Sequence, residues 1–132
     1  MIRPGRLDQE FVHLGLGATA VPQPSFDGMA WYEAYGARHG GDGAEGRLVS
    51  QYSFAEDWTS WEMHPHGAEV VICTAGAMVL TQELPGGALE RVRLVAGEYA
   101  VNPPGVWHTA DVEEPVTAIF ITAGEGTQHR PR

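Results

Sequence analysis

Short apolar runs separated by turn residues follow one another through the chain from residue 31 onward. Residues 91–95 alternate polar and apolar side chains, the period of a strand with one buried face. Residues 70–74 form an apolar run, and the sequence Pro85-Gly86-Gly87 predicts a hairpin turn. The runs that we interpret as strands cover residues 31–35, 48–54, 70–74, 77–80, 91–95, 98–101, 107–112 and 116–122.

Helical periodicity is weak throughout, and 17 glycines and 9 prolines disfavour long helices. Many short strands joined by closely spaced turns are typical of an all-β sandwich or barrel, and 132 residues suit one domain. We expect an N-terminal arm or edge segment at residues 1–30, a β-barrel at 31–123 and a C-terminal tail at 124–132. The N-terminal segment is a candidate to cover an exposed edge strand, in this chain or across a homodimer.

Charge limits the classes of partner, and the cysteine content and the apolar runs limit the disulfides and the location that we expect. Eight basic and 17 acidic side chains give a formal net charge of −9, and we therefore expect no nucleic acid and no membrane as a partner. Cys73 is the single cysteine, which excludes an intrachain disulfide, and its apolar neighbours indicate a core position. No run of about 18 apolar residues and no secretory signal is recognisable, so the expected location is cytoplasmic.

Two histidines that are two residues apart begin the candidate site. Because residues i and i+2 of a strand face the same side, His64 and His66 are expected to point into one cavity. Glu69 follows three residues later and reaches that side only where the chain bends, for which Pro65 and Gly67 provide a place.

A third histidine, His108, follows a sharp turn at residues 103–105. Three imidazoles and one carboxylate make a mixed nitrogen and oxygen site, which suits Fe, Mn, Ni, Cu or Zn better than Ca or Mg. This group contains the two-histidine, one-carboxylate set of non-haem iron chemistry, which leaves positions open for substrate or oxygen. We therefore predict one divalent transition metal, with the ligands His64, His66, Glu69 and His108.

The spacing of these residues resembles the two sequence motifs of the cupin family. The first motif reads Gly, five residues, His-x-His, three or four residues, Glu, six residues and Gly. This chain has His64-Pro65-His66, then Glu69 after a gap of two residues, then Gly76, and it carries Trp58 at the position of the first glycine.

The second cupin motif reads Gly, five residues, Pro-x-Gly, two residues, His, three residues and Asn. Gly97, Pro103, Gly105 and His108 keep each of these spacings, and Val112 stands at the asparagine position. The resemblance covers roughly residues 48–130 and points to small single-domain cupins of unassigned function. It implies a double-stranded β-helix, that is, a jelly-roll barrel, and it implies a homodimer.

Three further residues are candidates to line the pocket or support the ligands: Gln82, Tyr99 and Trp107. For Gln82 and Tyr99, residues of this kind more often hold ordinary strand positions. For Trp107, a large aromatic in a jelly roll is more often a packing residue.

The function predicted from the sequence is a metal-dependent enzyme that acts on a small organic molecule. Dioxygenase chemistry is slightly favoured over isomerase or decarboxylase chemistry, because an open nitrogen and oxygen site inside an apolar barrel suits it. One alternative is a non-catalytic module that binds a small ligand or senses a metal. Another is a sugar-related epimerase or isomerase.

Overall fold

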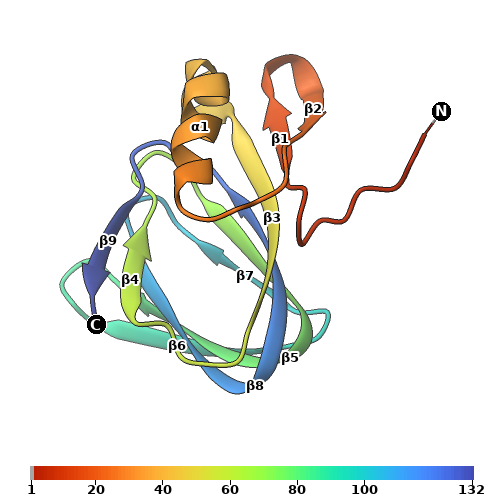
Figure 1. The fold of residues 1–132 in the computed structure, drawn as a ribbon. Helices are drawn as coiled ribbons and strands as arrows, with labels where there is room; N and C mark the ends of the chain where they lie inside the picture. Colours follow the sequence, from red (N-terminus) through yellow and green to blue (C-terminus); the bar gives the residue numbers. More distant parts are fainter. Residues whose placement is uncertain (1) are drawn as a thin grey trace.

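The computed structural model describes residues 2–132, whose strands form one continuous nine-stranded antiparallel sheet. It is folded into two halves, called the first and the second sheet below, that close into a barrel with a helix at one end (Figure 1). Two long strands, β5 (Glu69–Glu83) and β8 (Trp107–Thr122), pair with each other along most of their length. Their register shifts three times between Cys73 and Met78, where both strands bend. Each strand therefore contributes one half to each sheet.

The first sheet contains the N-terminal half of β5 and the C-terminal half of β8. Its remaining strands are β7 (Tyr99–Asn102), β3 (Arg47–Phe54), β1 (Val12–Gly15) and β2 (Thr19–Pro22). The second sheet contains the other halves of β5 and β8. Its remaining strands are β6 (Leu89–Val95), β4 (Ser60–Met63) and β9 (Gln128–Pro131).

The bend of β5 depends on Gly76. Its backbone has a φ of +79°, which favours glycine, and a Cβ atom at this position would collide with the carbonyl oxygen of Pro115 in β8. The two bent strands therefore approach each other more closely than a side chain at Gly76 would allow.

Alternate residues of the strands point inward and fill the space between the sheets. The buried core consists of Val71, Cys73, Met78, Leu94, Ala110, Val116, Ala118 and Phe120. Cys73 is fully buried, as its apolar run predicted. The half-buried rings of Tyr52, Phe54 and Trp58 pack against this core.

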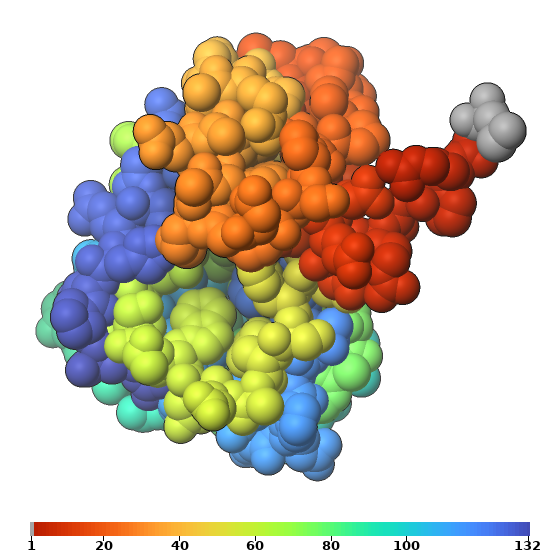
Figure 2. All heavy atoms as spheres, viewed as in Figure 1, coloured from red at the N-terminus to blue at the C-terminus, as the bar shows by residue number. Residues whose placement is uncertain are grey.

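The N-terminal part forms a layer at one end of the barrel, where α1 (Ala30–His39) lies beside β1 and β2 (Figures 1 and 2). The prediction of a strand at residues 31–35 is wrong, because these residues belong to α1. Trp31 is the one buried residue of this helix, and the single hydrophobic anchor leaves no helical periodicity to detect. Phe11, Trp31 and Leu48 form a second, smaller core under the helix.

Two short 3₁₀ segments, η1 (Leu16–Ala18) and η2 (Gly40–Glu45), connect elements of this layer. The helices within residues 2–132 do not reach the length and apolar character needed to cross a membrane.

Several predicted strands are longer than the sequence pattern indicated. Residues 70–74 and 77–80 join into β5, and residues 107–112 and 116–122 join into β8. At the C-terminus, β9 pairs with β4, and at the N-terminus β1 pairs with β3 of the same chain. The two terminal segments therefore extend the sheets themselves.

Candidate metal centre

Three side chains from strands β4, β5 and β8 and a fourth, His64, from the segment just after β4 converge at one end of the barrel. Glu62, His64, Glu69 and His108 each offer a ligand atom, and these four atoms lie within 4.8 Å of one another. His64 Nε2 lies 3.1 Å from an oxygen of Glu62 and 3.1 Å from Glu69 Oε2, and His108 Nε2 lies 3.2 Å from Glu69 Oε1. The side chains of His64, Glu69 and His108 are almost fully buried, whereas that of Glu62 is 25% exposed.

Strand pairing explains why these residues meet. Glu62 in β4 lies directly opposite His108 in β8, and His64 follows two residues later on the same side as Glu62. The backbone N–H of Gly105, in the turn before β8, donates a hydrogen bond of 2.9 Å to the carbonyl oxygen of His64. Glu69 is the first residue of β5, which runs between β7 and β8.

The Glu69 carboxylate is held by the two residues directly opposite it on the neighbouring strands. Asn102 of β7 donates to Oε1 at 3.0 Å, and Thr122 of β8 donates to Oε2 at 2.7 Å. Burial alone would raise the pKa of Glu69, but the close contacts with His108 and His64 outweigh it and hold this pKa far below its usual range. Glu69 is therefore an ionised carboxylate inside the barrel.

Each of the two buried histidines has its Nδ1 atom occupied. The hydroxyl of Thr127 donates to the carbonyl oxygen of Gly124, so that its oxygen accepts a hydrogen bond of 2.8 Å from His64 Nδ1. His108 Nδ1 donates to the carbonyl oxygen of Val106 at 3.3 Å. In the neutral form, both rings consequently carry their proton on Nδ1 and a lone pair on Nε2.

The two Nε2 atoms are buried and have no hydrogen-bond partner among residues 2–132. They approach the carboxylates closely but without the alignment of a hydrogen bond. Buried nitrogens of this kind are rare and require an explanation, of which an unseen ion is a common one. Two imidazole nitrogens and two carboxylates fit a divalent transition metal.

The same contacts control the charge of His64. Burial lowers its pKa, but the carboxylates of Glu62 and Glu69 raise it more, to about 9. In the metal-free protein this imidazole is therefore protonated at neutral pH, and a metal ion would have to displace that proton.

The structure brings together three of the four ligands predicted from the sequence: His64, Glu69 and His108. His66 is exposed and lies outside the cluster, and Glu62 occupies the fourth place. The strand alternation used for His66 ends at Met63, and the chain then turns at residues 65–67. The i, i+2 rule therefore joins His64 to Glu62, and not to His66.

The other three candidates take different positions. Gln82 supports the site indirectly, because its amide donates to Asn102, which in turn donates to Glu69. Tyr99 is 67% exposed on β7 and points away from the cluster. Trp107 packs under the guanidinium group of Arg130, which lies 4.5 Å from its ring centre.

Sequence reasoning missed Glu62, Asn102, Thr122 and Thr127. Glu62 could have been found from its i, i−2 relation to His64. The other three act through strand register or a turn, for which the sequence carries no recognisable signal.

Aromatic rings line the barrel interior next to His108. The ring of Trp58 lies 6.3 Å from that of His108 and 6.2 Å from that of Phe120, and Tyr52 follows at 6.0 Å from Phe120. The hydroxyl of Tyr52 is hydrogen-bonded to that of Tyr32 in α1. The candidate site therefore adjoins an apolar, aromatic interior.

A second group of possible ligands lies under the N-terminal layer and differs from the first. His13, His39 and Asp42 lie close together, but His13 contacts Tyr35 through Nδ1 and Asp42 through Nε2, both at 2.6 Å. His39 Nε2 accepts from the Gln23 amide at 2.9 Å. Because these nitrogens already have partners, the group connects β1, α1 and η2 and offers no free pair of ligand atoms.

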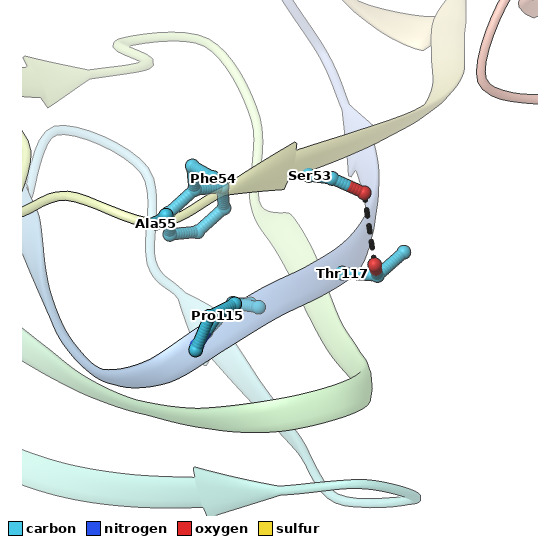
Figure 3. Close-up of a pocket in the computed structure, with 6 residues that line it drawn as sticks. Ser53, Phe54, Ala55, Pro115 and Thr117 are labelled. Carbon is cyan, nitrogen blue, oxygen red and sulfur yellow. Dashed lines mark hydrogen bonds between the residues drawn. The ribbon is translucent and has the colours of Figure 1, made fainter.

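A shallow depression of about 240 Å³ lies at the bend of β8, between the ends of Ser53–Ala55 and Pro115–Thr117 (Figure 3). The hydroxyl groups of Ser53 and Thr117 are hydrogen-bonded to each other there at 2.8 Å. The residues that line it include no histidine and no carboxylate. Its position in the middle of β8 also separates it from the cluster, whose contacts with β8 are at the two ends of that strand.

No protein-family model matches the chain, and no curated protein shows significant similarity to it. Several solved structures are similar to it in fold. A hydroquinone 1,2-dioxygenase from Sphingomonas sp. TTNP3 is 15% identical with a TM-score of 0.51, and the match covers 58% of this chain and 59% of that one. An oxalate oxidase is 19% identical with a TM-score of 0.51, over 61% of this chain and 44% of that one.

A cupin superfamily protein from Desulfitobacterium hafniense is 20% identical with a TM-score of 0.49, over 58% of this chain and 65% of that one. The chain thus spans less than two thirds of the length of each of these three proteins. At such low identities the likeness shows the fold alone. The fold is an all-β jelly roll, which confirms the fold class predicted from the sequence.

Proposed function

We propose that this protein is a metal-dependent enzyme acting on a small organic molecule, with dioxygenase chemistry favoured over isomerisation or decarboxylation. The observation that carries the proposal is the pair of buried Nε2 atoms of His64 and His108, which have no aligned hydrogen-bond partner among residues 2–132 and face the same ionised carboxylate. One ion bound between the two nitrogens and the carboxylates would satisfy all of these groups together.

The residues that would hold the metal are His64, Glu69, His108 and Glu62. When bound, a divalent metal such as Fe, Mn, Ni, Cu or Zn supplies a Lewis acid and, in the case of iron, a centre for oxygen chemistry. The two carboxylates balance the charge of a divalent ion. Thr122 and Asn102 orient Glu69, and the apolar rings of Trp58 and Phe120 keep bulk water from the interior side.

Glu62 is the most exposed of the four ligands and marks the side from which a small molecule can approach. Since its carboxylate is not enclosed, it is the ligand best placed to shift when a substrate binds. The names of two structural neighbours, a hydroquinone 1,2-dioxygenase and an oxalate oxidase, show that this fold supports oxygen-dependent reactions of small molecules in other proteins.

Oxygen uptake by the Fe²⁺-loaded protein tests this proposal. Small phenols, diols and dicarboxylates are supplied in turn, and the His64→Ala/His108→Ala variant serves as the control without a metal centre. We expect substrate-dependent oxygen consumption by the wild type and none by the variant. Tight metal binding without turnover of any compound, with Mn²⁺, Ni²⁺, Cu²⁺ or Zn²⁺ as well, would contradict an enzyme and support the non-catalytic binding module.

A further inference from the structure

We propose that the C-terminal turn at residues 124–127 is part of the metal centre, with Thr127 as a positioning residue that determines which nitrogen of His64 is free to bind metal. This inference rests on the proposed metal centre and concerns residues outside the ligand set. No cupin motif includes this turn.

The direction of the hydrogen bonds at Thr127 determines which nitrogen of His64 carries the proton. Its hydroxyl proton is used toward the carbonyl oxygen of Gly124 at 3.0 Å, so the oxygen has only lone pairs to offer to His64. The contact of 2.8 Å with His64 Nδ1 therefore requires the proton to be on Nδ1. The lone pair of the neutral ring is then on Nε2, the atom that faces Glu69.

The turn at residues 124–127 is held by its own hydrogen bond and by close packing. The N–H of Thr127 donates to the carbonyl oxygen of Gly124 at 3.2 Å, and Gly126 has a φ of +74°, as the third residue of a tight turn often does. A Cβ atom at Gly126 would lie 3.2 Å from the Pro65 side chain and 3.4 Å from the His66 ring. The turn is therefore packed closely against the segment that follows His64.

The segment that follows His64 also lies against Ala123, the residue before the turn. A Cβ atom at Gly67 would collide with the Cβ atom of buried Ala123, just before the turn. The exposed ring of His66 lies beside Gly126 of this turn, outside the cluster. Residues 64–67 and 123–127 therefore lie against each other, and the second segment supplies the Nδ1 partner of His64 through Thr127.

The strand after the turn, β9, lies against Glu62, a second proposed ligand. In β9, His129 lies directly opposite Glu62, and its Nε2 atom is 3.6 Å from Glu62 Oε2. The C-terminal segment therefore contacts both ligands supplied by β4 and the residues that follow it. This placement favours the same role as Thr127, namely to hold ligands in position.

Co²⁺ titration of the full chain tests the proposal, with the visible spectrum of the bound ion as a report of its coordination. Thr127→Val keeps the shape of the side chain but removes the acceptor, and Thr127→Ser keeps the hydroxyl and is the matched control. Loss of an outer partner of a metal-bound histidine weakens binding by roughly 10–100-fold. We expect that loss and an altered spectrum for Thr127→Val, and wild-type behaviour for Thr127→Ser.

Wild-type affinity in Thr127→Val would overturn the proposal while leaving the metal centre intact. An equal loss in both variants would also overturn it, because the hydroxyl would then not be the reason. A wild type that binds no Co²⁺ would instead refute the proposed metal centre, and this inference with it. Long-range ¹H–¹⁵N spectra of the Zn²⁺-loaded wild type need no variant: the proton must be found on Nδ1 of His64, and metal bound at Nδ1 would refute the assignment.

Discussion

His64 and His108 reach the same state through different partners. Thr127 accepts from one ring and the carbonyl oxygen of Val106 from the other, and in both cases Nε2 faces Glu69. Glu69 is in turn held by Asn102 and Thr122. A ring or carboxylate held in this way loses less conformational freedom when it binds an ion, because the protein has already ordered it.

Glu62, the fourth ligand that we propose, is the residue by which the cluster differs from the sequence motif. We expect Glu62→Gln to weaken metal binding by at least about tenfold, because a charged ligand is replaced by a weaker neutral one. His66→Gln should leave the affinity unchanged, since its ring is exposed and lies outside the cluster. Isothermal titration with Zn²⁺ measures both. A loss in His66→Gln with none in Glu62→Gln would restore the ligand set of the motif.

Metal binding should strengthen as the pH rises toward about 9. The Glu62 and Glu69 carboxylates overcome the effect of burial and raise the pKa of His64 to about 9, so below that pH one proton must leave for each ion bound. The apparent affinity should then rise about tenfold per pH unit up to that point and level off above it. Titration in buffers of different ionisation enthalpy gives the number of protons released. No proton release at pH 7 would contradict this account of the site.

The sequence predicted His64, Glu69 and His108 because these residues lie in spaced motifs punctuated by glycine and proline. The i, i+2 relation that suggested His66 applies equally to Glu62, since both are two residues from His64, and the cluster in the structure contains Glu62. The strand ends at Met63, and only the structure shows on which side of His64 the alternation holds. Asn102, Thr122 and Thr127 depend on register between distant segments, which local patterns do not specify.

At the scale of the elements, the two long strands determine where the ligands lie. β5 begins with Glu69, which pairs with Thr122 at the end of β8, whereas His108 near the start of β8 pairs with Gln82, so the two residues lie at opposite ends of the β5–β8 ladder. The bend in the middle of both strands separates the two sheets and returns the far ends to one another. Residues 70–74 and 77–80 appeared as separate runs in the sequence because Ala75 and Gly76 at the bend interrupt the pattern.

Gly76→Ala should destabilise the protein strongly, by about 3 kcal/mol or more, because it combines a positive φ with a collision against Pro115. Gly86→Ala is the matched control. Its φ of +94° is also unfavourable for alanine, but no atom lies within 4 Å of the added Cβ, and we expect a loss of about 1 kcal/mol. Urea unfolding followed by circular dichroism compares the two. Equal losses would show that the close approach of β5 and β8 is not important for stability.

At the scale of the whole molecule, the barrel architecture was predictable and the N-terminal layer was not. Regular turns, β-prone runs and two motifs indicated an all-β jelly roll, and the fold is confirmed by the structure and its neighbours. α1 has one buried residue, so its sequence gives no helical periodicity. The pairing of β1 with β3 of the same chain supplies an edge cover within one molecule, and the homodimer stays a prediction.

Residues 2–132 carry two groups of candidate ligands, and the buried nitrogens without a hydrogen-bond partner belong to the first of them. His13 and His39 are engaged by Tyr35, Asp42 and Gln23, so they connect the N-terminal layer internally. The two groups therefore differ in the one property that matters for an ion, namely lone pairs that are available and face each other.

Metal content of the untagged protein, purified without chelators and analysed for all first-row transition elements, tests the central claim most directly. The account predicts about one equivalent of Fe, Mn, Ni, Cu or Zn per chain, either as purified or after reconstitution. It also predicts that the His64→Ala/His108→Ala variant contains none. Two equivalents per chain would contradict a single centre, and no metal in either preparation would contradict the metal centre itself.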